Sequence, residues 1–386
     1  MVGAEKGSGI QMKKVMAFAK SEIVLTVAVL LALVSMFVIP PDTAYAGYID
    51  FRTLAVLFCL MAVMAGFQEA GVFQWIAEKM LKKVSNVFGV VYILVLLCFF
   101  FSMLITNDVA LITFVPFTFI VLKLLGDQLE RKLIVPVVVM QTIAANLGSM
   151  LTPIGNPQNL YLYGKSGLSF GAFMLLMLPY AAVSFVLLTG YCIFLGRQKQ
   201  EVQVDFAAST GLKGKEKAIF RYLALFLVSL LVVVHVIPYP VALAIVIVVL
   251  GLFDRKLFTR IDYALLLTFV GFFVFIGNMG RVPVFYEFLA RIIEGNEVMT
   301  AVVSSQVISN VPAALLLSGF TENVGGLIVG TNLGGLGTLI ASMASLISYK
   351  LIAKSDKCSK GTYFKSFTLW NVAFLAVLLA VHACLS

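Results

Sequence analysis

The sequence predicts an all-α polytopic membrane protein, built as an inverted repeat with two re-entrant helical hairpins and two broken transmembrane helices. Three observations predict it: composition, the spacing of apolar segments, and ordered self-similarity. Of the 386 residues, 61% are hydrophobic and 12% are charged, whereas soluble domains are about half apolar and about a quarter charged. So few charges cannot cover a water-facing surface, which argues against a soluble enzyme and, despite a net charge of +9, against a nucleic-acid-binding protein.

Long apolar segments supply the candidate spans, because a helix needs about 20 apolar residues to cross the hydrocarbon core. The candidates are Ile23–Ile39, Phe51–Ala70, Val87–Ile105, Val109–Leu125, Leu133–Leu151, Phe170–Leu195, Ile219–Ile237, Val241–Phe253, Tyr263–Asn278, Val298–Ile308, Pro312–Phe320, Val324–Leu351 and Phe367–Leu385. Val298–Ile308 and Pro312–Phe320 are too short to cross alone, and short paired segments indicate hairpins that enter the membrane and return. Val72–Val84 and Val284–Ile293 read as interfacial amphipathic helices.

The distribution of positive charge predicts the topology. With hairpins near Thr106 and Ser309 and the N-terminus inside, the inside loops hold all but four of the 28 Lys and Arg residues, as the positive-inside rule requires. The four on the outside are Arg52, Lys165, Arg281 and Arg291. We therefore expect a multi-pass protein of the cytoplasmic membrane with a cytoplasmic N-terminus and an outside C-terminus.

Self-comparison predicts a duplicated chain. Residues 49–51 (IDF) match 261–263 (IDY), residues 105–111 (ITNDVAL) match 308–314 (ISNVPAA), and residues 145–149 (ANLGS) match 331–335 (TNLGG), in the same order. Asp50 and Asp262, which precede matching spans and are expected to cap helices, fall on opposite sides of the membrane in this topology. Oppositely oriented repeats are characteristic of secondary transporters.

Polar residues interrupt the apolar limbs at Thr106, Asn107 and Asp108. Burying a carboxylate within the membrane costs free energy. The start of the second helix of the hairpin would stabilise it through unpaired N–H groups and the positive end of the helix. Such a tip can bind a cation or carry a proton; the alternative is that Asn107 or Asp108 merely caps a helix. Ser309 and Asn310 occupy the matching positions in the second half, where no acid follows them.

Helix breakers follow each expected hairpin. Pro153, Gly155 and Pro157 exclude a continuous helix, and unwound backbone at membrane depth is tolerated only inside protein or beside a wet cavity. The backbone near Gly148, with Thr152 and the amides of Asn146 and Asn156, can surround a small cation. Residues 325–338 form the glycine-rich counterpart, for which close helix packing through small residues is the alternative explanation.

These motifs resemble those of the ion transporter superfamily, above all its citrate-transporter-like and arsenite-permease-like branch, which is related to the divalent-anion sodium symporters. The resemblance lies in four segments: ITNDVALITFVPF at 105–117, ANLGSMLTPIGNPQN at 145–159, SNVPAALL at 309–316 and GTNLGGLGT at 330–338. The likeness extends from about Ile23 to Leu385. In the symporters both tips read Ser-Asn-Thr; Asp108 and Val311 replace the threonines here, and the acid is more similar to the arsenite permeases, which implies proton coupling.

The resemblance implies two hairpins that enter from opposite faces and an elevator-like transport domain on the scaffold of a homodimer. The implied division is a first repeat at 1–196 (scaffold part 23–100, transport part 101–196), a cytoplasmic connector at 197–218, and a second repeat at 219–386 (scaffold part 219–295, transport part 298–385).

The sequence thus predicts a secondary active transporter for a small anion or oxyanion, carboxylate- or arsenite-like, coupled to sodium or protons in the lipid bilayer. The expected cation-binding residues are Thr106, Asn107, Asp108, Asn146, Gly148, Ser309, Asn310, Thr331 and Asn332. The expected substrate-binding residues are Asn107, Thr152, Pro153, Gly155, Asn156, Asn310, Val311 and Thr338. No cofactor or metal beyond the coupling ion is expected, and the chain has no GxxxxGK[ST] motif for ATP.

Three alternatives remain open from the sequence. The first is a sodium/proton antiporter of the same superfamily. Such antiporters normally need more buried acids than Asp108, the single clear candidate in this sequence. The second is a passive channel, although paired hairpins and broken helices suit occlusion better than an open pore. The third is an intramembrane enzyme, for which no Ser/His or paired-Asp arrangement stands at matching depths.

Overall fold

The computed structural model describes residues 22–196, 201–202, 211–355 and 358–385. These residues form helices, with one isolated bridge between Asn86 and Glu201 and no strand in the described ranges. Seven helices in that part of the chain are long and apolar enough to cross a membrane, which confirms the all-α polytopic class. The expected N-terminal location and most of the connector at 197–218 fall on residues outside the described ranges.

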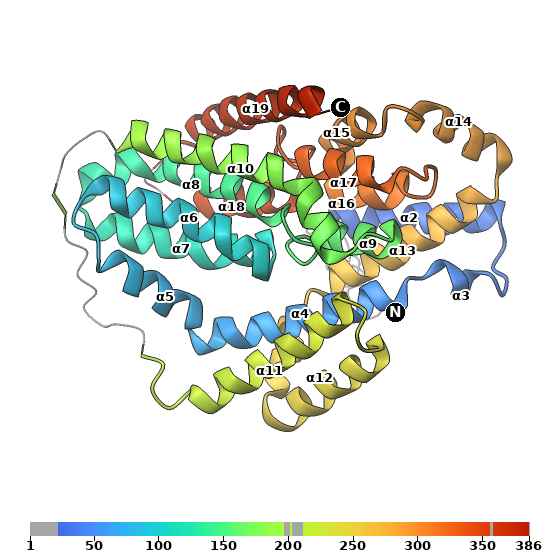
Figure 1. Cartoon of the computed structure of the whole chain (residues 1–386), viewed down its shortest axis with the longest axis horizontal. Coiled ribbons are helices and arrows are strands. Elements are labelled where there is room, and N and C mark those ends of the chain that lie inside the picture. Colours follow the sequence, from blue (N-terminus) through green and yellow to red (C-terminus); the bar gives the residue numbers. More distant parts are fainter. Residues whose placement is uncertain (1–21, 197–200, 203–210, 356–357, 386) are drawn as a thin grey trace, which may run out of the picture.

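One group of helices packs around α4. Its members are α2 (Ile23–Val38), α4 (Phe51–Ala70), α11 (Glu216–Val233), α12 (Tyr239–Phe253), the short 3-10 helix η1 (Arg255–Arg260) and α13 (Tyr263–Gly280). Within the group α13 packs along α2, while α11 and α12 pack on α4. We call this group the scaffold body; it lies along the lower edge and right side of Figure 1.

A second group of helices packs around α8, and we call it the core body. Its members are α6 (Val87–Ile105), α7 (Asn107–Leu124), α8 (Asp127–Ser149), α9 (Pro157–Ser166), α10 (Phe170–Leu195), α15 (Glu297–Ile308), α16 (Asn310–Leu317), α17 (Val324–Leu333), α18 (Met343–Ile352) and α19 (Lys360–Leu385). In the most apolar 18-residue window of each helix, 89% of α8 is buried, against 17% of α19. Helix α8 is therefore the interior helix, and α19 lies at the periphery (Figure 1).

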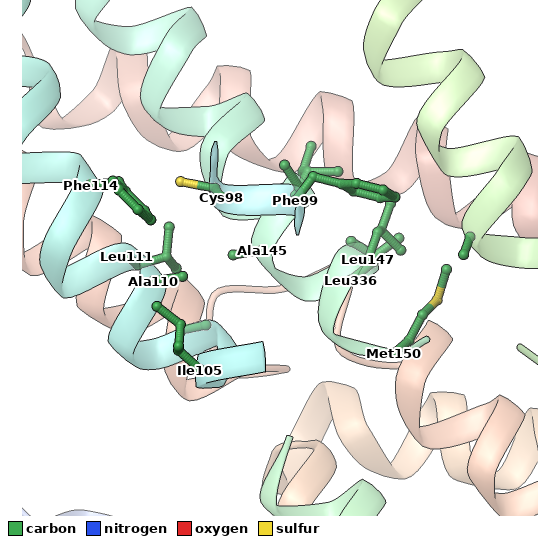
Figure 2. Packing of buried hydrophobic residues seen from close by; sticks show 14 of the residues in the cluster. Cys98, Phe99, Ile105, Ala110, Leu111, Phe114, Ala145, Leu147, Met150 and Leu336 are labelled. Carbon is green, nitrogen blue, oxygen red and sulfur yellow. The ribbon is translucent and has the colours of Figure 1, made fainter. Parts of the chain in front are cut away.

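Buried side chains from the two halves of the chain share one cluster. Figure 2 shows Phe99 of α6 close to Leu147 of α8 and Leu336, which follows α17. All three are nearly or fully inaccessible to solvent. The interior of the core body is therefore assembled from both halves together.

Three short helices, α3 (Tyr45–Tyr48), α5 (Val72–Leu81) and α14 (Pro283–Ile293), join the main elements. Helices α5 and α14 lie where the sequence predicts amphipathic helices. Near α3, Arg281 Nη1 donates hydrogen bonds to Asp42 Oδ2 at 2.7 Å and to Tyr48 Oη at 3.0 Å. The hydrogen bond from Arg281 lowers the pKa of the Asp42 carboxyl group, so this link between the loop after α2 and the end of α13 is charged at neutral pH.

Local sequence explains several helix starts. Asp50 accepts a hydrogen bond from Thr53 N at 2.9 Å, and Asp262 accepts one from Leu265 N at 2.9 Å. Both caps have φ −79° and ψ 84°. The prediction that these two acids cap helices is confirmed, and the matching caps agree with the expected duplication.

Three expected boundaries differ from the helices observed. Val324–Leu351, taken as one span, is two helices, α17 and α18, because residues 334–342 are not helical. Helix α11 begins at Glu216, inside the expected connector. The expected scaffold boundary at residue 100 falls within α6, which is continuous to Ile105 and packs along α8, so this helix belongs with the core body.

Candidate functional site

The two expected hairpin tips have the same backbone geometry. Helix α6 passes into α7 at Thr106, with φ 66° and ψ 149°, and α15 passes into α16 at Ser309, with φ 73° and ψ 154°. These positive φ values are costly for residues other than glycine. Neither Thr106 nor Ser309 makes a side-chain cap bond, so each tip is a sharp reversal enforced by its surroundings.

Each tip is fixed by a carbonyl from a neighbouring helix break. Asn107 N donates to Gly155 O at 3.1 Å, and Asn310 N donates to Ala341 O at 2.9 Å. The first break runs from Met150 to Asn156 between α8 and α9, and the second from Gly334 to Ser342 between α17 and α18. The expected pairing of a tip with an interrupted helix is therefore present in both halves.

The first break and its tip are joined by the side chains of Asn107, Asn146 and Thr152. Asn107 Nδ2 donates to Asn146 Oδ1 at 3.0 Å, and Asn107 Oδ1 accepts from Asp108 N at 2.9 Å. Thr152 Oγ1 donates to Met103 O in the last turn of α6. These contacts bring together four residues that the sequence assigns to the site.

The two breaks also cross one another. Ser342 Oγ, from the second break, donates to Asn146 Oδ1 at 3.0 Å, and Asn156 Nδ2, from the first, donates to Asn332 Oδ1 at 3.5 Å. In return Asn332 Nδ2 donates to Asn159 Oδ1 at 2.7 Å. The corresponding donation from Asn146 Nδ2 to Ser345 Oγ measures 3.5 Å.

This exchange is reciprocal. Asn146, near the end of α8, accepts a bond from Ser342 just before α18 and donates to Ser345, three positions further on. Asn332, near the end of α17, accepts a bond from Asn156 just before α9 and donates to Asn159, again three positions further on. The same relation in both directions supports the predicted duplication. It also holds the start of α18 against the end of α8, and the start of α9 against the end of α17.

Gly148 and Gly334 have the same packing role. A Cβ atom on Gly148 would lie 1.9 Å from Phe99 O and 2.6 Å from Ser102 Oγ, and one on Gly334 would lie 2.6 Å from Ser305 Oγ. No larger residue fits without displacement of the neighbouring helix. The Gly148 carbonyl accepts a bond from Leu151 N at 3.1 Å. Close packing requires a glycine here, and the expected role of this residue in cation binding stays a prediction.

A cavity of about 180 Å³ adjoins the first tip. Thr106, the cap of α7, and Asp108 in its first turn line the cavity together with Pro157 from α9 and Met343 from α18. Apolar residues of α4 with Gln68 line it too, as do the polar residues Arg260 and Asp262 from the scaffold body. Three helices thus present their N-termini to one cavity, and these positive ends attract negative charge.

Asp108 is an acid with unused hydrogen-bonding capacity. Its Oδ1 atom is shielded from solvent and has no hydrogen-bond partner among the described residues, a condition that costs free energy. Thr106 holds the cap position of α7 and Asp108 lies in its first turn. The acid is thus placed beside the cavity and the first break.

Some expected residues lie apart from this centre or use their polar groups elsewhere. Thr331 Oγ1 donates to Leu327 O, on its own helix, and the exposed Thr338 bonds Gln306 through both its N–H and its hydroxyl group. Val311 and Pro153 are buried and offer no side-chain hydrogen bond. The assignment of these four residues to cation or substrate binding stays a prediction.

The sequence did not indicate two amides that lie beside the breaks, Gln306 and Gln158. Gln306 Nε2 donates to Gly334 O at 3.0 Å and to Leu336 O at 2.9 Å, which fixes the second break. Gln158 is 1% exposed, and neither of its side-chain amide atoms has a partner within the described chain. The available signals were a lone amide in the apolar run 298–308 and a second amide next to Asn159.

Interrupted helices among apolar helices long enough to cross a membrane, with polar side chains gathered at the interruptions, are typical of membrane transporters. A comparison with known families agrees. The chain belongs to the citrate transporter family, whose model, described as "Citrate transporter", matches residues 15–325. The family resemblance read from the motifs is thereby confirmed.

The chain is also similar to individual proteins, two of which are named as a transporter or a membrane protein. The chain is 32% identical over 305 residues to an uncharacterized transporter of Methanocaldococcus jannaschii, covering 78% of this chain and 81% of the relative. It is 31% identical over 328 residues to the inner membrane protein YbiR of Escherichia coli, covering 82% and 84%. A 158-residue stretch, 39% of this chain, is 31% identical to 18% of the P protein of Sus scrofa.

Proposed function

We propose that this transporter is a secondary active carrier that moves a small anion or oxyanion, carboxylate- or arsenite-like, across the cytoplasmic membrane with sodium or protons as the coupling ion. The single observation that carries the proposal is the crossing of the two breaks, which brings helix N-termini and unwound backbone to one point. In secondary transporters such helix ends hold anionic groups, and unwound carbonyls hold the coupling cation.

Three features support an anionic substrate. The N-termini of α7, α9 and α18 reach the same cavity, and each is the positive end of its helix. The side chains from the two breaks are amides and hydroxyls, which bind oxygen-rich ligands without a net charge of their own. The family to which the chain belongs is described as citrate transporters.

The coupling ion is assigned to the first tip. Asp108 brings a negative charge to the cavity, and its Oδ1 atom lacks a partner among the described residues. Either a proton or a sodium ion bound at Asp108 would satisfy this oxygen atom. At the second tip the corresponding residue is Val311, so we expect one charged cation site and one that relies on Asn310 and backbone oxygens.

The proposed movement is of the elevator type, in which the core body slides along the scaffold body. The described contacts between the bodies are few compared with the contacts inside each body. Helix α13 meets α16 and α4 meets α9 through small contacts, whereas α6 and α8 share a far more extensive one. A dimer through the scaffold body belongs to the same proposal, as does the expected orientation of the termini.

The test is uptake by proteoliposomes that contain wild-type or Asp108→Asn protein, under imposed sodium and proton gradients. Asparagine keeps the size and removes the charge, so we expect gradient-driven uptake of citrate or arsenite to fall by about ten-fold or more while the protein stays folded. Asp50→Asn is the matched control, because Asp50 is a helix cap and asparagine also caps helices well. Unchanged uptake with the same ion dependence in Asp108→Asn would exclude the proposed role of this acid.

A sodium/proton antiporter is the second candidate. The observation that favours it is the charge of the cavity, where Asp108 and Asp262 face a single cation, Arg260. Arg260 is exposed and its Nη2 lies 3.8 Å from Glu69 Oε2. Sodium-driven proton movement in liposomes without any added anion would favour the antiporter over the anion carrier.

A further inference from the structure

A second cavity, of about 320 Å³, lies between the core body and the scaffold body. From the core body it is lined by Tyr163 near the end of α9, by the turn 167–169 and by Phe170 at the start of α10. From the scaffold body it is lined by Val234 and His235, in the loop between α11 and α12. This cavity shares no lining residue with the cavity beside the first tip, and its volume lies in the range of about 300–1,000 Å³ that is usual for small-ligand sites.

Tyr163 brings an unused hydroxyl group to this cavity. The residue is 3% exposed and lines the cavity, and its Oη atom makes no hydrogen bond with any described residue. Tyr161, two positions earlier on the same helix, bonds Ser318 Oγ through its own hydroxyl group at 2.9 Å. A buried tyrosine hydroxyl group usually has a partner, so we expect a group bound in the cavity to satisfy Tyr163 Oη.

The start of α10 makes the cavity favourable for negative charge. Ser169 and Phe170 line the cavity at the N-terminus of this 26-residue helix, where the first N–H groups have no partner within the helix and form its positive end. Ser169 Oγ accepts from Ala172 N at 3.1 Å, which leaves the earlier N–H groups to a ligand. Among the described residues that line the cavity there is no acid.

Arg52 adds a full positive charge on the side of the scaffold body. Its Nη2 atom donates to the carbonyl oxygens of the last two residues of α11, at 3.1 and 3.3 Å, which fixes the guanidinium group just before the loop that holds His235. A Cβ atom on Gly164, which lines the cavity, would lie 3.6 Å from Arg52 Nη1. The ring centroids of Tyr163 and His235 are 5.9 Å apart, so one ligand can reach both side chains.

The geometry points to a second anion-binding site, which takes a carboxylate or phosphate group between the two bodies. Tyr163 Oη and the imidazole group of His235 donate to the oxygen atoms of the anion. The first N–H groups of α10 and the nearby Arg52 balance its charge. Such a group comes either from a free oxyanion or from the headgroup of an anionic phospholipid. Because the binding groups belong to both bodies, an occupied site links them. This site is separate from the proposed transport site, and neither depends on the other.

The first experiment titrates the purified full-length protein with inorganic phosphate in a calorimeter. Tyr163→Phe removes only the unbonded hydroxyl group, so we expect phosphate affinity to fall about ten-fold or more, as for the loss of a hydrogen bond to a charged ligand. Tyr161→Phe is the matched control, because its hydroxyl group already has a partner in Ser318; it should bind phosphate as wild type does. Phosphate bound beside the first tip would be insensitive to Tyr163→Phe.

A pair of variants at His235 tests the sign of the charge. His235 has φ 62°, a conformation that asparagine and aspartate tolerate better than most residues. His235→Asn and His235→Asp therefore both suit the backbone, have the same size and differ in charge. We expect His235→Asp to abolish phosphate binding by repulsion and His235→Asn to weaken it by less. If Tyr163→Phe melts well below wild type without phosphate, this pair decides alone.

The second experiment tests a lipid as the source of the anion. Native mass spectrometry measures how much phosphatidylglycerol the wild-type protein and the variants retain after purification with this lipid. If free phosphate does not bind, retention of the lipid by wild type and its loss from Tyr163→Phe and His235→Asp support the site with a lipid headgroup as its ligand. The inference is overturned if neither probe binds, or if both bind wild type, Tyr163→Phe and His235→Asp equally well.

Discussion

Asn146 uses its whole side chain to join the two halves of the protein. Its Oδ1 atom accepts from Asn107 Nδ2 and Ser342 Oγ, and its Nδ2 atom lies 3.4 Å from Gly335 O. Since the residue is 3% exposed, water cannot replace these partners. A single amide thus links the first tip to the second break.

Replacement of Asn146 by alanine should impair stability and transport together. Asn107 Nδ2 and Ser342 Oγ lose a buried acceptor, so we expect a loss of about 1–3 kcal/mol in unfolding free energy and uptake near background. Thermal unfolding and proteoliposome uptake measure the two effects. Asn371→Ala is the control, because Asn371 is also fully buried but bonds within α19; it should retain uptake. Normal uptake by Asn146→Ala would show that the crossing is not needed for transport.

At the residue scale, sequence reasoning located the polar centres but not all their partners. Asn107, Asn146, Asn156, Asn310 and Asn332 stand out because amides are rare among apolar residues. The partners of Asn146 and Asn332, above all Ser342 and Asn159, come from the opposite half. No local pattern records a contact between residues so distant in the chain.

At the scale of the helices, close approach of α6 and α8 sets the position of the first break. These helices make the most extensive contact between any two elements of the described chain, and Gly148 lies against the carbonyl group of Phe99. The packing ends α8 beside the tip of α6. Asn107 N can then donate to Gly155 O.

Gly148→Ala should displace α6 from α8. The added Cβ atom would lie 1.9 Å from Phe99 O, and overpacking of a core costs about 1–3 kcal/mol or more. Gly190→Ala is the control, because a Cβ atom on this glycine of α10 meets nothing within 4 Å; alanine there should be neutral or stabilising by up to about 1 kcal/mol. Chemical or thermal unfolding measures the stability of the two variants relative to wild type. Equal stability of both would contradict the tight contact.

The element boundaries follow from apolar runs and helix breakers, which explains why α4, α6 and α10 begin and end where the sequence predicts. The error at Val324–Leu351 has a physical cause. Glycines alone do not end a helix as prolines do, and the second break contains glycines, whereas the first contains Pro153. What keeps residues 334–342 unwound is Gln306, bound to the carbonyl groups of Gly334 and Leu336.

On the scale of the whole molecule, the two bodies meet through a limited surface. One contact joins α13 to the end of the second hairpin, where a Cβ atom on Gly319 would lie 2.6 Å from Ile276 Cγ2. A sliding core body must break this contact in each cycle. The pair therefore offers a direct test of the proposed movement.

A disulfide between Ile276→Cys and Gly319→Cys should stop uptake reversibly, because it ties the scaffold body to the core body. The more accessible native thiols, Cys358 and Cys384, are replaced by serine beforehand. The control pair is Phe88→Cys with Gly196→Cys, whose Cβ positions are also close but which both lie in the core body. Uptake before and after oxidation, then after reduction, gives the answer. Full uptake by the oxidised first pair would contradict sliding at this contact.

The division into two bodies was only partly predictable from sequence. Repeats and charge indicated a duplicated chain and the class of protein. They did not indicate that α6 belongs to the core body, because an apolar run in the sequence does not reveal which helix it packs against. That assignment depends on which helix faces α6, and the face is set by Gly148 on a different segment.

The exchange of hydrogen bonds between the breaks has a consequence for biosynthesis. The partners are separated by 173 to 199 positions along the chain. At a translation rate of about 5–20 residues per second, the ribosome takes roughly 10–40 s to cover that interval. During this time the amides of the nascent first half, already inserted, must be hydrated or held by the insertion machinery. We therefore expect the core body to complete its buried hydrogen bonds only after the last third of the chain has been inserted.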